Sequence, residues 1–213
     1  MKAMSEFLSK QAQFSFTSRV RYDRTLEDGG LVEVNRTHQV HALRPSRLRA
    51  TLVGDRFVRA LFVEKNKMTI YDLDRNEFFQ ASGGKTIDSA MEKLVTEFGQ
   101  SLPGVDFVYS NPYASLMSNV RTSRYMGVEV LDGRPVHHLV FGQADVEWQL
   151  WIEEGPHPAP TRIVINYIGR PGRPRFSADL TWDFSDVPFS TSTFTFAAPE
   201  GAKKVASFPS MAN

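Results

Sequence analysis

The stretch His137–Tyr167, HHLVFGQADVEWQLWIEEGPHPAPTRIVINY, decides the fold because it contains three successive strand signals. His137–Phe141 is a short apolar and aromatic run, and Val146–Ile152 alternates with an apolar side chain at every second position. The segment Gly155–Pro160 contains three prolines, which lack the backbone donor of a strand or helix, so the chain turns there. Arg162–Ile168 then resumes a strand with two apolar faces, one of which is expected to meet a second layer or a cavity.

Length and composition favour one large domain with a substantial core. The chain has 213 residues, of which 41% are hydrophobic and 16 are Phe. Its net charge of +1 gives no field that would attract nucleic acid, so no nucleic-acid partner is expected. The absence of cysteine excludes disulfides, thiolate metal sites and cysteine nucleophiles. No apolar run reaches about 18 residues, so we expect a protein that does not span a membrane.

The N-terminal sequence MKAMSEFLSK lacks the hydrophobic core of a signal peptide. Two interpretations stay open at this point. The protein remains in the cytosol, or the sequence begins after a signal peptide that has been removed.

Alternating patterns before and after the opening stretch predict a continuous antiparallel meander and not β-α-β units. A short helix is expected at Ala3–Gln11. The further predicted strands are Phe14–Thr25, Leu31–Arg44, Arg47–Gly54, Val58–Glu64, Lys67–Asp72, Glu77–Ala81, Val120–Val130, Arg175–Phe184 and Thr193–Phe196.

A helical insert interrupts the strands in the middle of the chain. Apolar residues recur at helical spacing over Ile87–Phe98, with Thr86 as a suitable N-cap and Gly99 as a suitable end. Asn111-Pro112 predicts the start of a second helix that runs to about Asn119. An amphipathic insert must bury its apolar side, and the concave side of a curved sheet is the nearest apolar surface.

Three groups of motifs, spread over nearly the whole chain, together carry a resemblance. They are His137-His138-Leu139-x-Phe141 with Glu147–Glu153, Pro158-x-Pro160 and Arg162–Ile165; Thr86-Ile87-Asp88 with Leu102-Pro103 and Asn111-Pro112-Tyr113; and Ser192–Phe196 with Pro199-x-Gly201-Ala202. They resemble the DUF2092 family of predicted bacterial periplasmic proteins. That family is similar in fold to the LolA/LolB-like lipoprotein carriers.

The resemblance implies a mainly β protein with a helical insert, of the α+β class. The expected architecture is a half-open curved antiparallel β-sheet, or incomplete barrel, with helices covering its concave face. It implies a single LolA/LolB-like domain over residues 1–213, with a helical lid at about 86–119. It also implies export to the periplasm, although this sequence shows no signal peptide. No catalytic residues come with the family.

The residues themselves do not predict an enzyme, and no cofactor or metal is expected. His137 and His138 are strand neighbours that point to opposite faces, so they cannot hold one metal ion together. Asp179 and Asp183 share a strand face without a partner nucleophile, which is typical of a solvated surface. Phosphate-loop, nucleophile-elbow and zinc-helix motifs are absent from the sequence.

The surplus of aromatic residues is the most informative feature for function. One interpretation is ordinary core packing under the helices. The other is an apolar cavity between the sheet and the helical lid. The candidate cavity residues are Met91, Leu94, Val95, Phe98, Phe141, Trp148, Phe176, Trp182 and Phe184.

Two functions follow from these alternatives. The first is a periplasmic, non-enzymatic carrier or binding protein for a lipid, an acyl chain or another apolar ligand, with a lipid or a lipoprotein acyl chain as the partner. The second is a sensor or scaffold domain that binds another envelope protein and holds no lipid. A sheet filled by its own aromatic side chains favours the second.

Overall fold

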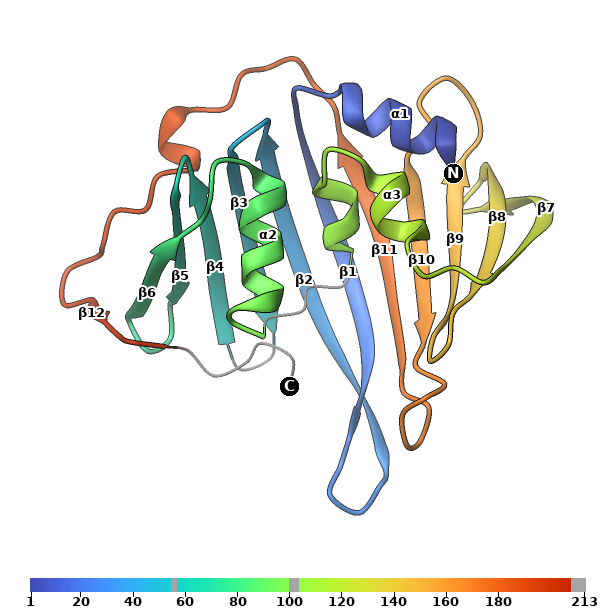
Figure 1. Cartoon of the computed structure of the whole chain (residues 1–213), viewed down its shortest axis with the longest axis horizontal. Helices are drawn as coiled ribbons and strands as arrows, with labels where there is room; N and C mark the ends of the chain where they lie inside the picture. The colour runs from blue at the N-terminus through green and yellow to red at the C-terminus, as the bar shows by residue number, and fades with distance from the viewer. Residues whose placement is uncertain (55–56, 100–103, 208–213) are drawn as a thin grey trace. The chain divides into compact units, whose positions relative to one another are not determined.

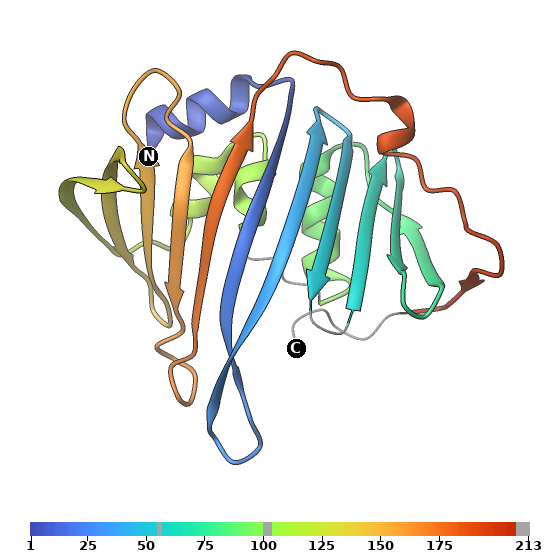
Figure 2. The same cartoon turned by 180° about the vertical axis from the view of Figure 1, so that it is seen from behind.

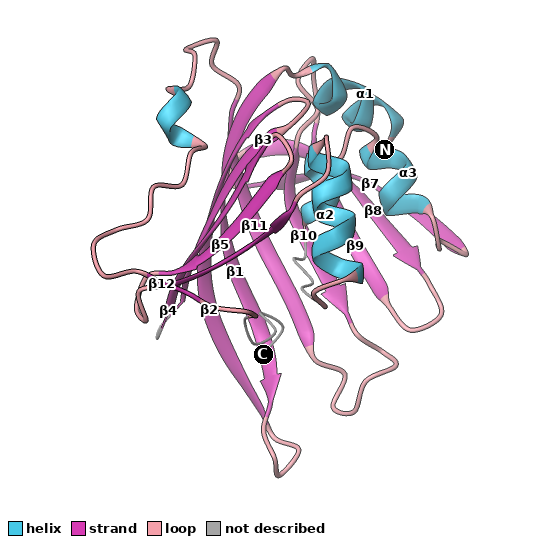
Figure 3. Ribbon diagram, turned by 60° about the vertical axis from the view of Figure 1, so that its left-hand side comes forward, coloured by secondary structure: helices cyan, strands magenta, loops and turns pink. Residues whose placement is uncertain are grey.

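The structure, a computed structural model, describes residues 1–54, 57–99 and 104–207, so the Leu102-Pro103 motif lies outside the described residues. Strands dominate it (Figures 1 and 3). The strands are β1 (Gln13–Thr25), β2 (Leu31–Leu43), β3 (Arg47–Gly54), β4 (Phe57–Glu64), β5 (Lys67–Asp72), β6 (Glu77–Ser82), β7 (Thr122–Leu131), β8 (Arg134–Gly142), β9 (Glu147–Glu153), β10 (Pro160–Asn166), β11 (Arg175–Asp183) and β12 (Lys203–Lys204). The helices are α1 (Lys2–Lys10), α2 (Ile87–Thr96) and α3 (Pro112–Met117), with the 3₁₀ helices η1 (Val105–Val108) and η2 (Thr191–Thr193).

The strands form a 12-stranded sheet in the order β12-β6-β5-β4-β3-β2-β1-β11-β10-β9-β8-β7. Successive strands are neighbours along most of this order, and β3 to β6 and β7 to β11 pair antiparallel. Only the short β12 is shown to pair parallel, with β6. Among the residues that the structure describes, β12 and β7 each have a strand neighbour on one side only, so the sheet is open. The predicted mainly β, antiparallel meander with a helical insert is therefore confirmed.

Contacts divide the chain into two compact units whose segments interleave along the sequence. The first unit comprises Met1–Lys10, Ser18–Arg36 and Asn111–Thr181. The second comprises Gln11–Thr17, Thr37–Ser110 and Trp182–Asn213. The predicted single domain over residues 1–213 stays a prediction.

In the first unit, the N-terminal helix α1 packs against α3. Met4 and Leu8 are buried on α1, as the apolar spacing of that helix predicts. The Ser5 hydroxyl accepts a hydrogen bond from the Tyr113 backbone N–H at 2.9 Å. As predicted, Asn111 caps α3, because its side chain accepts a hydrogen bond from the Ala114 N–H and Pro112 follows at the first helical position.

In the second unit, α2 buries the apolar stripe that its sequence predicts, formed by Ile87, Ala90, Met91 and Leu94. Thr86 is the N-cap, since its hydroxyl accepts a hydrogen bond from the Ser89 N–H. α2 ends at Thr96, two residues before the predicted end at Phe98. A turn follows and closes at Gly99, which has a φ of 61° and donates its N–H to the Val95 carbonyl.

The predicted strand Thr193–Phe196 is wrong. The segment forms η2 and a turn, because the Ser190 hydroxyl accepts a hydrogen bond from the Ser192 N–H and so satisfies the backbone locally. Phe194 is fully buried, and the ring of Phe196 contacts those of Phe62, Tyr71 and Phe78. Figure 2 shows this C-terminal segment passing along β5 and β6 to β12. The alternating aromatics thus pack onto a sheet without joining it.

Candidate ligand-binding site

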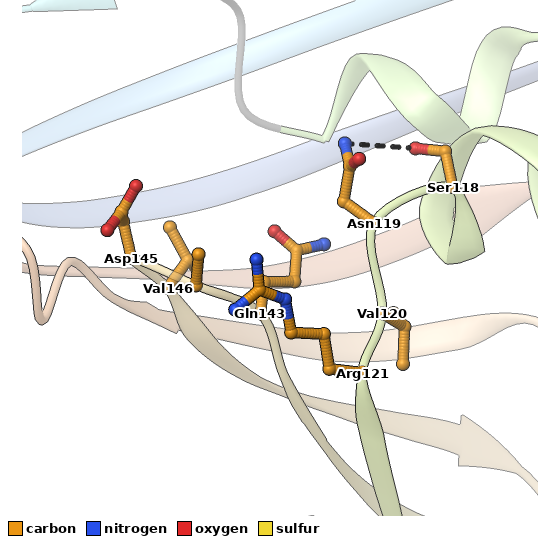
Figure 4. Close-up of a pocket in the computed structure, with 8 residues that line it drawn as sticks. Ser118, Asn119, Val120, Arg121, Gln143, Asp145 and Val146 are labelled. Atoms are coloured by element: carbon orange, nitrogen blue, oxygen red, sulfur yellow. Dashed lines mark hydrogen bonds between the residues drawn. The ribbon is translucent and has the colours of Figure 1, made fainter.

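A pocket of about 450 Å³ lies in the first unit, where α3 ends and β7 begins. It faces the turn between β8 and β9. Figure 4 shows Arg121, Gln143 and Asn119 along its wall, with Asp145 at another part of the rim. The lining residues are Ser118, Asn119, Val120, Arg121, Gln143, Ala144, Asp145 and Val146.

Short backbone hydrogen bonds hold the walls of this pocket. The Arg121 N–H donates to the Gly142 carbonyl at 2.8 Å, which fixes the start of β7 against the end of β8. Across the β8–β9 turn, the Gln143 N–H donates to the Val146 carbonyl at 2.8 Å. These bonds place one guanidinium, one carboxylate and two amide side chains around the pocket, a set that can hydrogen-bond a polar or charged group.

Gly169 supports the same turn from the loop after β10. Its N–H donates to the Asp145 carbonyl at 3.1 Å. A Cβ added at position 169 would lie 2.8 Å from the Asp145 Cβ, closer than real side chains approach. The close approach therefore requires glycine at this position.

Three of the predicted cavity residues lie in the first unit, in one row across neighbouring strands. Phe141 pairs with Trp148 in the β8–β9 register, Trp148 with Ile165, and Ile165 with Phe176. The rings of Phe141 and Trp148 are stacked, with centroids 4.1 Å apart. All three aromatics are buried, so this row belongs to the core of the first unit. We call the side of the first unit's strands that carries this row the inner face.

The inner face becomes exposed at the edge strand β7. Tyr125 pairs with Leu139 and Val128 with His137, so both side chains lie on the same face as Phe141. Tyr125 is 57% exposed, Val128 50% and Val130 76%. Arg121, Ser123 and Tyr125 are alternate residues, so the exposed apolar line begins at the wall of the pocket.

The other six predicted cavity residues lie in the second unit. Met91 and Leu94 are 1% exposed on α2, whereas Val95 on the same helix is 44% exposed. Phe98 meets Phe79 of β6 edge to face, which places α2 over the β6 face that carries Phe79. Trp182 and Phe184 stack on each other and join an aromatic cluster with Phe14, Phe16 and Phe107. None of the nine predicted residues lines the pocket, and their role in binding stays a prediction.

Two further sets of contacts hold the end of η1 and the residues after it within the second unit. Asp88 accepts hydrogen bonds from the Ser110 N–H and hydroxyl at 2.9 and 2.5 Å. The Arg44 guanidinium donates to the carbonyls of Val108 and Tyr109, both at 2.9 Å. Burial lowers the pKa of Arg44, and the charge of Asp88 opposes this effect. The segment after η1 is thus tied both to α2 and to the end of β2.

The opposite, outer face of the first unit's edge strands carries a polar cluster. His138 Nδ1 lies 2.6 Å from Glu129 Oε1, and the Trp151 indole N–H donates to Glu129 Oε2 at 3.0 Å. Hydrogen bonds from Trp151 first, and from His138 second, lower the pKa of Glu129. His137 points to the other face and meets the Tyr125 hydroxyl, as the alternation predicts. Within the described residues, no group of three or more His, Cys, Asp or Glu side chains could hold a metal ion.

Asp179 is a structural carboxylate and not a free surface group. It lies between two arginines, with Arg21 Nη2 at 2.7 Å and Arg162 Nε at 2.5 Å. Its side chain is only 18% exposed. The sequence predicted a solvated carboxylate at Asp179, whereas the structure pairs this carboxylate with Arg21 and Arg162.

A family model described as "Predicted periplasmic protein (DUF2092)" matches residues 1–207. The chain belongs to the DUF2092 family. The resemblance drawn from the motifs is confirmed, and so is the expected periplasmic localisation, since the description assigns DUF2092 to the periplasm. No helix among the described residues is long and apolar enough to span a membrane. No functionally curated protein matches the chain.

Among solved structures, LppX supports the fold of this DUF2092 protein. The lipoprotein LppX of Mycobacterium tuberculosis is 14% identical with a TM-score of 0.51, over 89% of this chain and 94% of LppX. LprF of Mycobacterium bovis is 14% identical with a TM-score of 0.49, over 94% of each chain. A LolA superfamily protein of Nitrosomonas europaea is 12% identical with a TM-score of 0.43, over 92% of this chain and 97% of that one.

The pocket of this DUF2092 protein was not predicted from its sequence. Its walls consist of common polar residues in two connecting segments, Ser118–Arg121 and Gln143–Val146, and carry no motif. The one available signal was Gly142, which begins the β8–β9 turn. Asn119, in the other wall segment, follows a helix that the sequence did predict. Nothing in the sequence, however, indicates that Ser118–Arg121 and Gln143–Val146 lie side by side.

Proposed function

We propose that this protein binds a lipid, an acyl chain or a similar amphipathic molecule in the periplasm, with no bond made or broken. The observation that carries the proposal is the exposed apolar line on the inner face of β7, which starts beside the pocket at Arg121. Apolar side chains left in water favour an apolar partner by roughly 25 cal/mol per Å² that is buried.

In this proposal the two ends of the ligand meet different surfaces. The polar end enters the pocket, where Arg121 and Gln143 offer hydrogen-bond donors. The apolar end follows Tyr125, Val128 and Val130 along β7. The fold shared with LppX, itself a lipoprotein, is compatible with this proposal.

The proposal includes the helical lid expected from the sequence. Within the second unit, the predicted cavity residues on α2 would contact the ligand beneath this lid helix. Met91 and Leu94 are buried by the protein itself, so a ligand reaches them only after α2 moves. Movement of α2 requires the Asp88–Ser110 hydrogen bonds to break.

Native mass spectrometry of the protein purified from cells, followed by organic extraction and lipid analysis, tests the proposal. We expect a co-purifying lipid at a fixed ratio, and weaker binding of added fatty acid by Arg121→Glu than by the wild type. Arg19→Glu, an exposed arginine on β1 of the same unit, is the matched control and should bind normally. A protein that carries no lipid and takes up neither fatty acid nor phospholipid contradicts the proposal.

The alternative is a sensor or scaffold domain that binds another envelope protein. Over the described ranges β7 has no strand partner besides β8, and this apolar edge favours the alternative, because such edges accept additional strands. A lipid-free protein that captures a strand from another envelope protein would support it.

A further inference from the structure

β7 is an edge strand with a largely apolar, exposed set of side chains. It pairs with β8 on one side, and the structure, over its described residues, places no strand on the other. Edge strands of stable monomers are normally covered or carry charges. Here most of the large side chains along the strand are apolar and at least half exposed: Tyr125, Met126, Val128 and Val130.

A bulge in β7 changes which side chains share a face. The β7–β8 register shifts between Tyr125 and Gly127, so that Arg124 pairs with Val140 and Glu129 with Val136. Val140 and Val136 are four positions apart on β8, which puts Arg124 and Glu129 on the same, outer face. In a strand without the bulge, residues five apart would lie on opposite faces.

We propose that β7 pairs antiparallel with β7 of a second copy of this chain, about a two-fold axis between Met126 and Gly127. This register sets Arg124 opposite Glu129 of the second copy, and the symmetry repeats the pair. Tyr125 then lies opposite Val128 of the second copy on the inner face. The interface is self-complementary, as a two-fold interface must be.

Charge and shape both select this register. Each exposed Arg124 meets a carboxylate, and opposite charges directly across two strands stabilise the pair whereas like charges destabilise it. Glu129 keeps its bonds to His138 and Trp151, because a carboxylate accepts about four hydrogen bonds. Tyr125 and Val128 form the aromatic and β-branched cross-strand pair that sheets favour. A shift by one residue loses both matches.

This inference does not depend on the proposed function. Pairing of the two strands gives hydrogen-bond partners to backbone N–H and C=O groups along the outer edge of β7, and it buries the sides of the β7 side chains that face the second copy. The inner face of Tyr125 and Val128 stays open, so a ligand and a second copy do not compete. Lipid analysis and measurement of the oligomeric state therefore fail or succeed separately.

Light scattering coupled to size exclusion, over a range of protein concentrations, measures the pairing. We expect a concentration-dependent dimer in the wild type. The dimer of Arg124→Glu should be about tenfold weaker, because the new carboxylate at each position 124 lies opposite Glu129 of the second copy. The double variant Arg124→Glu/Glu129→Lys should restore dimerisation, because the swapped charges again meet across the axis. Arg19→Glu, also an exposed strand arginine, should leave the dimer unchanged.

Cysteine crosslinking tests the register without relying on the charge variants, since the chain contains no cysteine. Directly opposed residues have Cα atoms about 4.5–5.5 Å apart, within the range that a disulfide spans. A mixture of Tyr125→Cys and Val128→Cys should therefore crosslink more than either variant alone, and more than a mixture of Ser123→Cys and Val128→Cys. A protein that stays monomeric at every concentration, or a dimer indifferent to Arg124→Glu and uncrosslinked in this register, overturns the inference.

Discussion

Asp88, in the first turn of α2, accepts two hydrogen bonds from Ser110, one from the backbone N–H and one from the hydroxyl. The two residues belong to the same unit but are 22 positions apart in the chain. This contact joins the start of one predicted lid helix to the residue that precedes the cap of the other. In the proposed function, it is therefore a contact that α2 has to break in order to move.

Asp88→Ala should loosen the lid. The loss of both hydrogen bonds should lower the free energy of unfolding by about 1 kcal/mol, since the site is partly exposed. We also expect faster uptake of a fluorescent fatty acid, measured by stopped flow. Glu92→Ala, on the exposed side of the same helix, should change neither quantity. A slower uptake in Asp88→Ala would count against a lid at α2.

Leu94 and Val95 are neighbours on α2 with opposite burial, so they make a matched pair. Leu94→Ala should lower the free energy of unfolding by about 2–5 kcal/mol, because it removes a buried side chain and leaves a cavity. Val95→Ala, at a position 44% exposed, should change it by less than about 0.5 kcal/mol. Urea titration measures both values, and equal effects would contradict the packing of α2.

The stabilising contribution of Glu129 should be lost at acid pH. Hydrogen bonds from Trp151 and His138 hold its pKa below the ordinary 4.5, so the folded state binds the proton less readily than the unfolded state. The resulting stabilisation is present above about pH 4.5 and is lost as the pH falls through the lower, folded pKa. The free energy of unfolding of Glu129→Gln should therefore depend less on pH in this window. Identical pH profiles for wild type and variant would contradict the bonds to Glu129.

Tyr109 should act in the opposite direction at alkaline pH. Burial first, and then the charges of Asp106, Glu92 and Asp88, raise its pKa from 10.0 to about 12. Between these values the unfolded state has released the phenol proton and the folded state has kept it, so stability falls as pH rises. Tyr109→Phe should flatten the alkaline fall in the free energy of unfolding from pH 10 upward. A fall as steep as that of the wild type would place the titration elsewhere.

The strands were the most predictable part of this molecule. β3 and β5 begin and end where alternation and turn residues indicate, and Lys65, with a φ of 54°, forms the expected hairpin turn between β4 and β5. The start of β7 was predicted at Val120 but lies at Thr122. The Val120 N–H bonds the Met117 carbonyl, so a helical turn extends beyond α3. Residues between a helix and a strand, such as Val120, can join either element, and tertiary contacts determine which one they join.

The site was much less predictable than the strands. Periodicity places Met91 and Leu94 on the buried side of α2 but cannot say whether a ligand or the protein itself covers them. The bulge at Met126 changes the face of every later residue on β7. The alternation of apolar and polar residues along β7 does not reveal this bulge. The polar pocket and the exposed β7 line both depend on such local irregularities.

The hydrogen bond from the Tyr113 N–H to Ser5 joins residues 108 positions apart, and the whole second unit before Ser110 lies between them in the chain. Docking of α1 on α3 therefore closes a long loop of chain, and Met4 and Leu8 stay unprotected until that loop has closed. We expect early intermediates to keep this helix bound to a holding chaperone or undocked. Closure of this long loop, and not the local stability of the helix, then determines when α1 becomes resistant to proteases during folding.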